Sequence, residues 1–293
     1  METFFSFLEK RVDDCSSLLC VGLDPHIPDL STNSRQSLKE PTAASALDFC
    51  LHLVKQTAPY AAAFKPNAAF FEVFGAEGWI ALKQVIEAIQ EESNRLGSMI
   101  PVILDAKRGD IASTAEAYAK SAFENLGAHC VTLSPYLGKD SIEPFIQDRE
   151  KGVFLLCKTS NLGSGDLQDL ILAKVSEPSQ RLHLYEHVAQ LAQNWNTKNN
   201  IGLVVGATHI DALKRVRAVA PDLWFLAPGI GAQGGELESA LKAGLRKDGK
   251  GMLIPISRGI SRAESPAKAA AEIRDQIVNI RMQFRTLKNA DSR

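Results

Sequence analysis

Two aspartates and a lysine at the end of one short apolar segment are the residues of this chain best suited to chemistry. Residues 101–114 read PVILDAKRGDIAST, so Asp105 and Lys107 close the segment and Asp110 lies on the following turn. Asp105 and Lys107 are two residues apart in an extended segment, so their side chains should leave the same face. Two acids around one ammonium group would make a fixed charge cluster. A simple loop salt bridge is the alternative, and this motif alone does not decide between them.

A second candidate site, near the C-terminus, has the composition of a phosphate-binding site. Residues 228–235 read PGIGAQGG, and residues 255–260 read PISRGI. The glycines of the first motif are Gly229, Gly231, Gly234 and Gly235. Glycines let backbone N–H groups approach an anion, and a helix is expected to begin at Glu236 just after them. The guanidinium of Arg258 can form two parallel hydrogen bonds with phosphate oxygens. We therefore expect a phosphate group to bind here.

Short apolar segments alternate with segments of helical period along the chain. The apolar segments are residues 17–23, 61–65, 101–105, 128–133, 152–157, 201–205, 223–227 and 252–256. Each is too short for a helix and nearly continuously apolar, as strands are when both faces of a parallel sheet are buried. The helical segments are residues 43–57, 76–96, 114–126, 179–195, 211–219, 236–243 and 266–287.

This alternation predicts an α/β fold, a (β/α)8 TIM barrel built from right-handed βαβ units. A doubly wound open sheet is the alternative. It would normally carry a G-x-G-x-x-G turn after the first strand, where this chain reads VGLDP. No linker interrupts the pattern, so we expect residues 1–293 to form a single barrel domain, with residues 1–15 as an N-terminal helix that caps the barrel floor.

The active site of such a barrel lies where the strands end, and polar residues follow most of the expected strands. They are Asp24, Lys65, Asn67, Asp105, Lys107, Asp110, Ser134, Lys158, Thr159, Ser160, Thr208, His209 and Arg258. Because buried charges must be paired, lysines and aspartates that converge on one rim are hard to explain as purely structural residues. We expect a phosphorylated ligand that binds at the last two strands and reacts at the second and third.

The composition is that of a soluble globular protein and excludes several classes of function. The 293 residues include 33 basic and 34 acidic ones, which leaves no basic footprint for nucleic acid or a membrane surface. The N-terminus lacks the apolar core of a signal peptide, and no apolar run approaches the ~18 residues that span a membrane. The five cysteines are scattered and lack C-x-x-C, which is typical of the reducing cytoplasm. The six histidines are dispersed, so we expect no metal site.

Five motifs indicate a family by resemblance. They are VGLDP (residues 21–25), FKPN (64–67), LDAKRGDIAST (104–114), APGIGAQGG (227–235) and PISRGI (255–260). Together they resemble the orotidine 5′-phosphate decarboxylase family, and most closely its longer, bacterial-type branch. The resemblance implies a carboxy-lyase that converts orotidine 5′-monophosphate to UMP and CO2, the last step of de novo pyrimidine biosynthesis. It also implies that the enzyme uses no metal and no organic cofactor.

The resemblance assigns roles to the polar residues of the first three strands. Loss of CO2 from C6 leaves a poorly delocalised carbanion, which Lys107 would stabilise as a fixed cation and then protonate. Asp105 would face the substrate carboxylate, and Lys65 would pair with Asp105 and reach the ribose. Asp24 would bind the ribose hydroxyls. Asn67, in FKPN, would be a further substrate-binding residue.

The resemblance also implies a homodimer, in which Asp110 and Thr114 act in the site of the partner subunit. Ser160 would read the pyrimidine ring. Residues 161–178 form a long connection, which we expect to fold over the pyrimidine as a lid. The substrate-binding residues expected around the phosphate are Gly231, Gln233, Arg258 and Gly259.

Other functions compete with this one. A Mg²⁺-dependent enzyme like 3-keto-gulonate-6-phosphate decarboxylase, of the same superfamily, shares D-x-K-x-x-D. The lysine of FKPN and the A-Q-G-G turn favour the nucleotide enzyme. A Schiff-base aldolase that uses a barrel lysine is a second alternative. A non-catalytic barrel that binds a phosphorylated ligand is a third, but binding alone does not require the Lys–Asp cluster.

Overall fold

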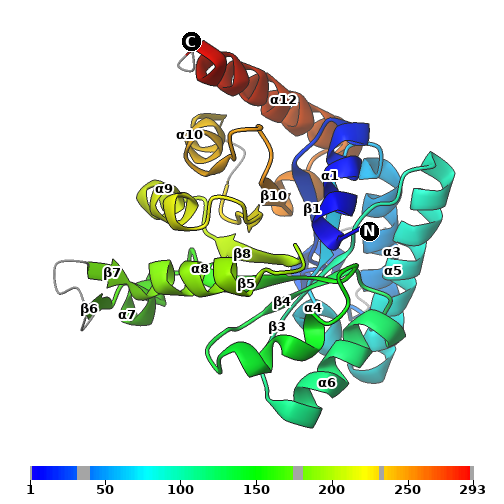
Figure 1. Cartoon of the computed structure of the whole chain (residues 1–293). Helices are drawn as coiled ribbons and strands as arrows, with labels where there is room; N and C mark the ends of the chain where they lie inside the picture. Colours follow the sequence, from blue (N-terminus) through cyan, green and yellow to red (C-terminus); the bar gives the residue numbers. More distant parts are fainter. Residues whose placement is uncertain (1, 32–39, 174–180, 231–233, 291–293) are drawn as a thin grey trace.

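Eight parallel strands form a closed barrel in the computed structural model (Figure 1), which describes residues 2–31, 40–173, 181–230 and 234–290. Their order is β2-β1-β10-β9-β8-β5-β4-β3. The parallel bridges Phe64–Val102 and Asn67–Asp105 join β2 to β3 and close the barrel. The strands are β1 (Leu19–Leu23), β2 (Ala63–Pro66), β3 (Ile103–Arg108), β4 (Cys130–Leu133), β5 (Gly152–Lys158), β8 (Ile201–Val205), β9 (Phe225–Leu226) and β10 (Met252–Ile256). The prediction of a (β/α)8 barrel is confirmed.

Helices cover the outside of this barrel, so most strand residues are buried on both faces. The longer helices are α3 (Ala43–Thr57), α5 (Gly75–Leu96), α6 (Ala112–Lys120), α8 (Leu184–Trp195), α9 (Ile210–Val219), α10 (Gly234–Gly244) and α12 (Pro266–Ala290). The short ones are α2 (Ile27–Ser31), α4 (Ala69–Glu72), α7 (Gly165–Gln168) and α11 (Arg258–Ser261). A π-helical turn, η1 (Ser121–Asn125), continues α6, and the 3₁₀ turns are η2 (Lys139–Ser141), η3 (Glu143–Phe145) and η4 (Leu162–Ser164). Within the described ranges, no helix is long and apolar enough to cross a membrane.

The connection between β5 and α8 differs from the sequence-based expectation. A helix was expected from residue 179, but α8 begins at Leu184, and the residues before it form β7 (Arg181–His183). β7 pairs antiparallel with β6 (Ile171–Ala173), and Figure 1 shows this hairpin projecting from the side of the barrel. His183 ends the hairpin as the N-cap of α8, and its backbone N–H donates to Glu186 Oε2 over 2.8 Å. Hairpin pairing therefore overrides the local helical period.

The N-terminal helix α1 (Phe4–Cys15) lies across the N-terminal end of the barrel, the floor. Phe5 stacks on Trp224, just before β9, with ring centroids 6.1 Å apart. The ring of Phe4 fills the space beside Gly152, the first residue of β5, where a Cβ atom would clash with it. The two aromatic residues are almost completely buried and fix α1 on the floor.

Candidate active site

The carboxyl ends of β2 and β3 bring two lysines onto one carboxylate. Lys65 Nζ lies 2.8 Å from Asp105 Oδ2, and Lys107 Nζ lies 2.6 Å from Asp105 Oδ1. Asp24, just after β1, adds a carboxylate oxygen 3.9 Å from Lys65 Nζ. The side chains of Lys65 and Asp105 are 9% and 11% exposed, whereas that of Lys107 is 51% exposed. Lys107 therefore carries the ammonium group that an incoming ligand can reach.

A bulge in β3 sets the orientation of Lys107. The pairing of β3 with β4 shifts register between Leu104 and Arg108, and Lys107 has a φ of 46°. Thr132 of β4 holds this turn: its Oγ1 accepts the backbone N–H groups of Ala106 (3.1 Å) and Lys107 (2.9 Å) and donates to Asp105 Oδ1 (3.0 Å). Strand alternation thus correctly predicted that the side chains of Asp105 and Lys107 lie together. It did not predict the bulge and the positive φ of Lys107 that bring them together. Thr132 was missed because its contact depends on strand pairing.

The pairing keeps the cluster ionised. Burial alone would raise the pKa of Asp105, but the ammonium groups of Lys65 and Lys107 outweigh it and lower that pKa from 3.8 to about 2. Burial would lower the pKa of Lys65, but the carboxylates of Asp105 and Asp24 raise it above its usual range. The cluster therefore holds fixed charges of both signs at neutral pH.

A cavity of about 630 Å³ opens beside the cluster, between the ends of β1, β2, β9 and β10. Asp24, Lys65, Asn67, Arg258 and Gly259 line it. Among the described residues, neither Asp24 Oδ1 nor Ser257 Oγ has a hydrogen-bond partner, although both atoms are buried. Buried polar atoms are normally satisfied, so these two are available to a ligand.

A second cavity of about 620 Å³ lies between the segments that follow β5 and β8. Ser160 and Thr208 line it, and both approach Gly229 of the first cavity. A Cβ atom on Gly229 would lie 3.3 Å from Thr208 Cγ2 and 3.5 Å from Ser160 Cβ. The two cavities are therefore neighbours along one rim, with Ser160 at their border.

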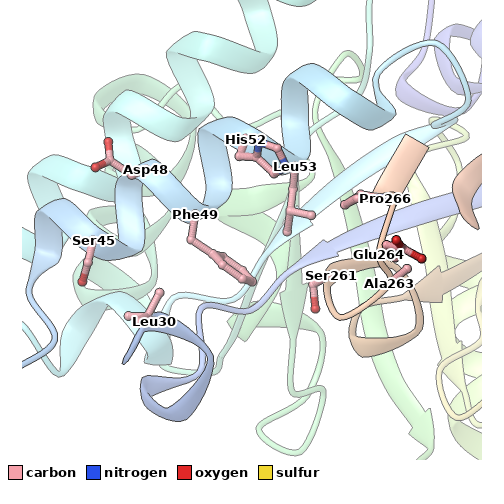
Figure 2. Close-up of a pocket in the computed structure, with 10 residues that line it drawn as sticks. All are labelled: Leu30, Ser45, Asp48, Phe49, His52, Leu53, Ser261, Ala263, Glu264 and Pro266. Atoms are coloured by element: carbon pink, nitrogen blue, oxygen red, sulfur yellow. The ribbon is translucent and has the colours of Figure 1, made fainter. Parts of the chain in front are cut away.

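The cavity in Figure 2 has a different location. It measures about 390 Å³ and lies outside the strands, between α2, α3 and the segment after α11. Leu30, Phe49 and Leu53 form its apolar part, and His52 and Glu264 are also in its wall. None of the lysines and aspartates of the charge cluster lines it. It is therefore no part of the candidate active site.

Comparison with known proteins identifies the family. The orotidine 5′-phosphate decarboxylase / HUMPS family matches residues 17–273. The chain belongs to this family. An orotidine 5′-phosphate decarboxylase of Roseiflexus castenholzii is 46% identical over 275 residues, which are 92% of this chain and 93% of that protein.

Solved structures agree with this family. The OMP decarboxylase of Leishmania donovani superposes with a TM-score of 0.81 at 52% identity, covering 96% of this chain and 99% of that one. The UMP synthase of the same organism gives a TM-score of 0.82 at 54% identity, and the match covers 96% of this chain and 57% of that longer one. The barrel and its family are thus supported by sequence and by structure.

The structure brings most, but not all, of the residues expected for this family to one rim. Asp110 does not join the cluster within its own chain: its Oδ1 accepts the backbone N–H of Ile111 over 2.8 Å, and no ion pair connects it to the other described residues. Thr114 lies exposed on the first turns of α6. Gly231 and Gln233, expected at the phosphate, lie outside the described residues.

In the described part of the chain, no three His, Cys, Asp or Glu side chains are grouped so that they could hold a metal ion. Sequence reasoning missed His26 and Ser257, which also line the first cavity. The His26 ring packs edge-on against Phe70, with centroids 4.3 Å apart. His26 follows the VGLDP motif directly, and Ser257 precedes Arg258, so proximity to these motifs was the available signal.

Proposed function

We propose that this chain decarboxylates orotidine 5′-monophosphate to UMP, the reaction for which its family is named. The observation that carries the proposal is the series of ion pairs from Lys65 through Asp105 to Lys107, beside a cavity with Asp24 and Arg258 in its wall. Family membership supports this substrate, and the relatives from Roseiflexus castenholzii and the first of the two from Leishmania donovani are named as its decarboxylases.

The proposed mechanism uses fixed charges. The bond between C6 and the carboxylate breaks, its electron pair stays on C6, and CO2 leaves. The ammonium of Lys107 stabilises the developing carbanion and then transfers a proton from Nζ to C6. Asp105 holds Lys107 in place and lies beside the carboxylate that departs. Because Lys65 keeps Asp105 ionised, the electrostatic field exists before the substrate binds.

Binding is assigned to the remaining rim residues. Asp24 and Asn67 bind the ribose, and Asp24 Oδ1, which has no hydrogen-bond partner among the described residues, accepts a ribose hydroxyl. Arg258 and the backbone N–H of Gly259 bind the phosphate. Ser160 reads the pyrimidine. Gly231 and Gln233 are proposed to complete the phosphate site.

A homodimer is part of the proposal, with Asp110 and Thr114 serving the partner subunit's site. Exposed apolar residues occur in the segments that follow β2, β3 and β4 along the chain; they are Val73, Ile80, Ile111, Tyr136 and Leu137. Such a surface is typical of a protein interface, and a two-fold interface would exchange the two loops equally.

We further propose that residues 1–293 form one domain, that the lid comes from residues 161–178, and that the enzyme is cytoplasmic. All five cysteines are buried thiols, which suits a reducing compartment.

The deciding experiment follows the absorbance of orotidine 5′-monophosphate after the enzyme has been treated with EDTA. We expect full turnover without added metal, and none with Lys107→Ala. Dependence on added Mg²⁺ would point to the metal-dependent alternative. Inactivation by borohydride in the presence of substrate would point to a Schiff base.

A further inference from the structure

We propose that the ion pair between Lys158 and Asp169 positions Ser160 for contact with the pyrimidine. The inference rests on the proposed function, in which Ser160 touches the substrate. It assigns positioning roles to Lys158 and Asp169, which line the second cavity together with Ser160.

Lys158 is committed to contacts inside the protein. It is the last residue of β5, and its side chain is 5% exposed. Its Nζ lies 2.7 Å from Asp169 Oδ1, donates to Ser164 Oγ over 3.1 Å, and lies 5.8 Å from the ring centre of Tyr185. The ammonium group is therefore held by the loop that follows the strand, unlike the half-exposed ammonium of Lys107.

Thr159 adds a second connection to the same loop. Its backbone N–H donates to Gln168 Oε1 over 2.9 Å, and its Oγ1 accepts from Gln168 Nε2, also over 2.9 Å. The two residues before Ser160 are thus tied to Gln168 and Asp169, at the end of α7. We call this pair of contacts, Lys158–Asp169 and Thr159–Gln168, the loop clamp.

The far end of the loop clamp is itself fixed to the barrel wall. The backbone N–H of Leu184, the first residue of α8, donates to Leu170 O over 2.8 Å. His183 Nδ1 lies 3.0 Å from Asp169 O, in a contact whose direction depends on the tautomer. In the arrangement that this structure shows, Asp169 is therefore tied to the start of α8, and its ion pair with Lys158 connects that position to the end of β5.

Ser160 has little room to move on its other side. A Cβ atom on Gly206 would lie 3.1 Å from both Ser160 Cβ and Ser160 N. The backbone N–H of Gly206 donates to Lys158 O over 2.7 Å and aligns the ends of β5 and β8. Ser160 therefore packs against Gly206 on one side and follows the loop clamp directly in the chain, while it stays exposed toward the rim.

Stability alone is a weak reason for this half-buried ion pair, because desolvation of the Lys158 ammonium offsets much of the attraction between the charges. Positioning is a stronger reason, since a misplacement of about 1 Å at a reacting site costs on the order of 100-fold in rate. Loss of Asp169 would leave the Lys158 ammonium buried without its counter-ion, and the strand end would have to shift to hydrate it.

The test is a double-mutant cycle that joins Asp169 to Ser160. We expect Asp169→Ala and Ser160→Ala each to lower kcat/KM for orotidine 5′-monophosphate, by ~10- to 100-fold. The double variant should be no worse than the poorer single variant within about twofold, because both changes remove the same contact. Asp169→Asn, which keeps a hydrogen-bond acceptor for Lys158, should recover part of the loss, and it replaces Asp169→Ala if that variant fails to fold.

The pair Lys250–Asp13, at the opposite end of the barrel, provides a matched control. Its Nζ and Oδ2 atoms are 2.6 Å apart, and its side chains are 14% and 62% exposed, against 5% and 48% for Lys158 and Asp169. Asp13→Ala should leave kcat and KM within about twofold of the wild type. Thermal unfolding of Asp13→Ala and Asp169→Ala then separates a loss of stability from a loss of positioning.

The two proposals fail in different ways. If Ser160→Ala leaves kcat/KM unchanged, the assignment of Ser160 to the substrate is wrong. If Ser160→Ala is impaired but Asp169→Ala and Asp169→Asn match the wild type, only the positioning role is overturned. If the losses of the single variants multiply in the double variant, Asp169 acts independently of Ser160 and the inference is also overturned.

Discussion

The two ends of the barrel use their buried polar groups in opposite ways. At the floor, Arg217 donates to the carbonyls of Leu223 (2.6 Å) and Gly251 (2.9 Å), among others. Asn200 Nδ2 likewise donates to several carbonyls, including that of Lys151 (3.0 Å). These contacts satisfy backbone groups where strands begin, and they leave those side chains no capacity for a ligand.

At the rim, three buried polar atoms lack a hydrogen-bond partner in the part of the chain that the structure describes. Asp24 Oδ1, Ser257 Oγ and His209 Nε2 have no hydrogen-bond partner there, and all three residues line rim cavities. Outside the rim cavities only Gln193 Oε1, on α8, shares this state among the described residues, and nothing in the structure explains it. An unsatisfied buried group costs ~1–3 kcal/mol, so the rim gives up stability that the floor retains. The comparison indicates that the buried polar groups of the floor stabilise the fold, whereas those of the rim that lack partners are kept for binding a ligand.

The largest effect is expected where the rim exposes its charge. Lys107→Ala removes the proposed proton donor and cation, and kcat should fall by more than ~10²–10⁴-fold, the range for general acid–base catalysis alone. Stability should change little, since the Lys107 side chain is half exposed and the Lys65–Asp105 pair remains. Steady-state turnover and thermal unfolding measure the two quantities. If Lys107→Ala kept more than a tenth of the wild-type kcat, the assignment of Lys107 as proton donor and cation would be wrong.

Subunit mixing tests whether the rim is completed by a second chain. Lys107→Ala and Asp110→Ala should each be almost inactive, but a mixed dimer places both defects in one site and leaves the other intact. Random exchange makes about half of the dimers mixed, so activity should recover to about a quarter of wild type. Absence of recovery, despite subunit exchange demonstrated by labelled chains, would place Asp110 in the site of its own chain.

Local sequence patterns predicted the strands and the lysines and aspartates at their ends, because the alternation of apolar segments follows the path of the main chain. They could not predict Thr132, whose contact to Asp105 requires β3 and β4 to pair across a bulge. Asp169 was missed for a similar reason: it lies 11 residues from Lys158, in a loop that has no periodic pattern. Asp110 was recognised as part of the motif, yet the chain alone does not bring it into the cluster. The periodic pattern of apolar residues therefore does not determine the contacts between strands, between loops or between subunits.

A mutation at the floor should lower stability and leave turnover almost unchanged, the opposite of what is expected for Lys107→Ala at the rim. Arg217→Met removes hydrogen bonds to carbonyls that stay buried, and the free energy of unfolding should fall by ~2–4 kcal/mol. The kcat of the folded enzyme should stay within about twofold of wild type, since Arg217 lies at the far end from the cluster. Urea unfolding and turnover per active site check this. A kcat loss as large as that of a rim variant would mean that the two ends are not independent.

The smallest effect concerns the pH dependence of stability. The pKa of Asp105 is lowered from 3.8 to about 2, so the folded state keeps this carboxylate ionised at a pH where the unfolded state is already protonated. The resulting stabilisation, about 2 kcal/mol, is fully present above pH 3.8 and is lost as the pH falls toward 2. The difference in unfolding free energy between wild type and Asp105→Asn should therefore be constant from about pH 5 to 8 and shrink below about pH 4.

Asp248 at the floor is the comparison for this titration. Burial would raise its pKa, but its hydrogen bond from Arg246 contributes most to lowering it instead. Its side chain is half exposed, so solvent screens the pair and the pH-dependent stabilisation should be smaller than for Asp105. Asp248→Asn should change the acid limb of the urea-unfolding profile less than Asp105→Asn does. Equal changes for both variants would show that Lys65 and Lys107 do not give Asp105 a larger pH-dependent stabilisation than Arg246 gives Asp248. The proposed electrostatic difference between the two ends of the barrel would then be wrong.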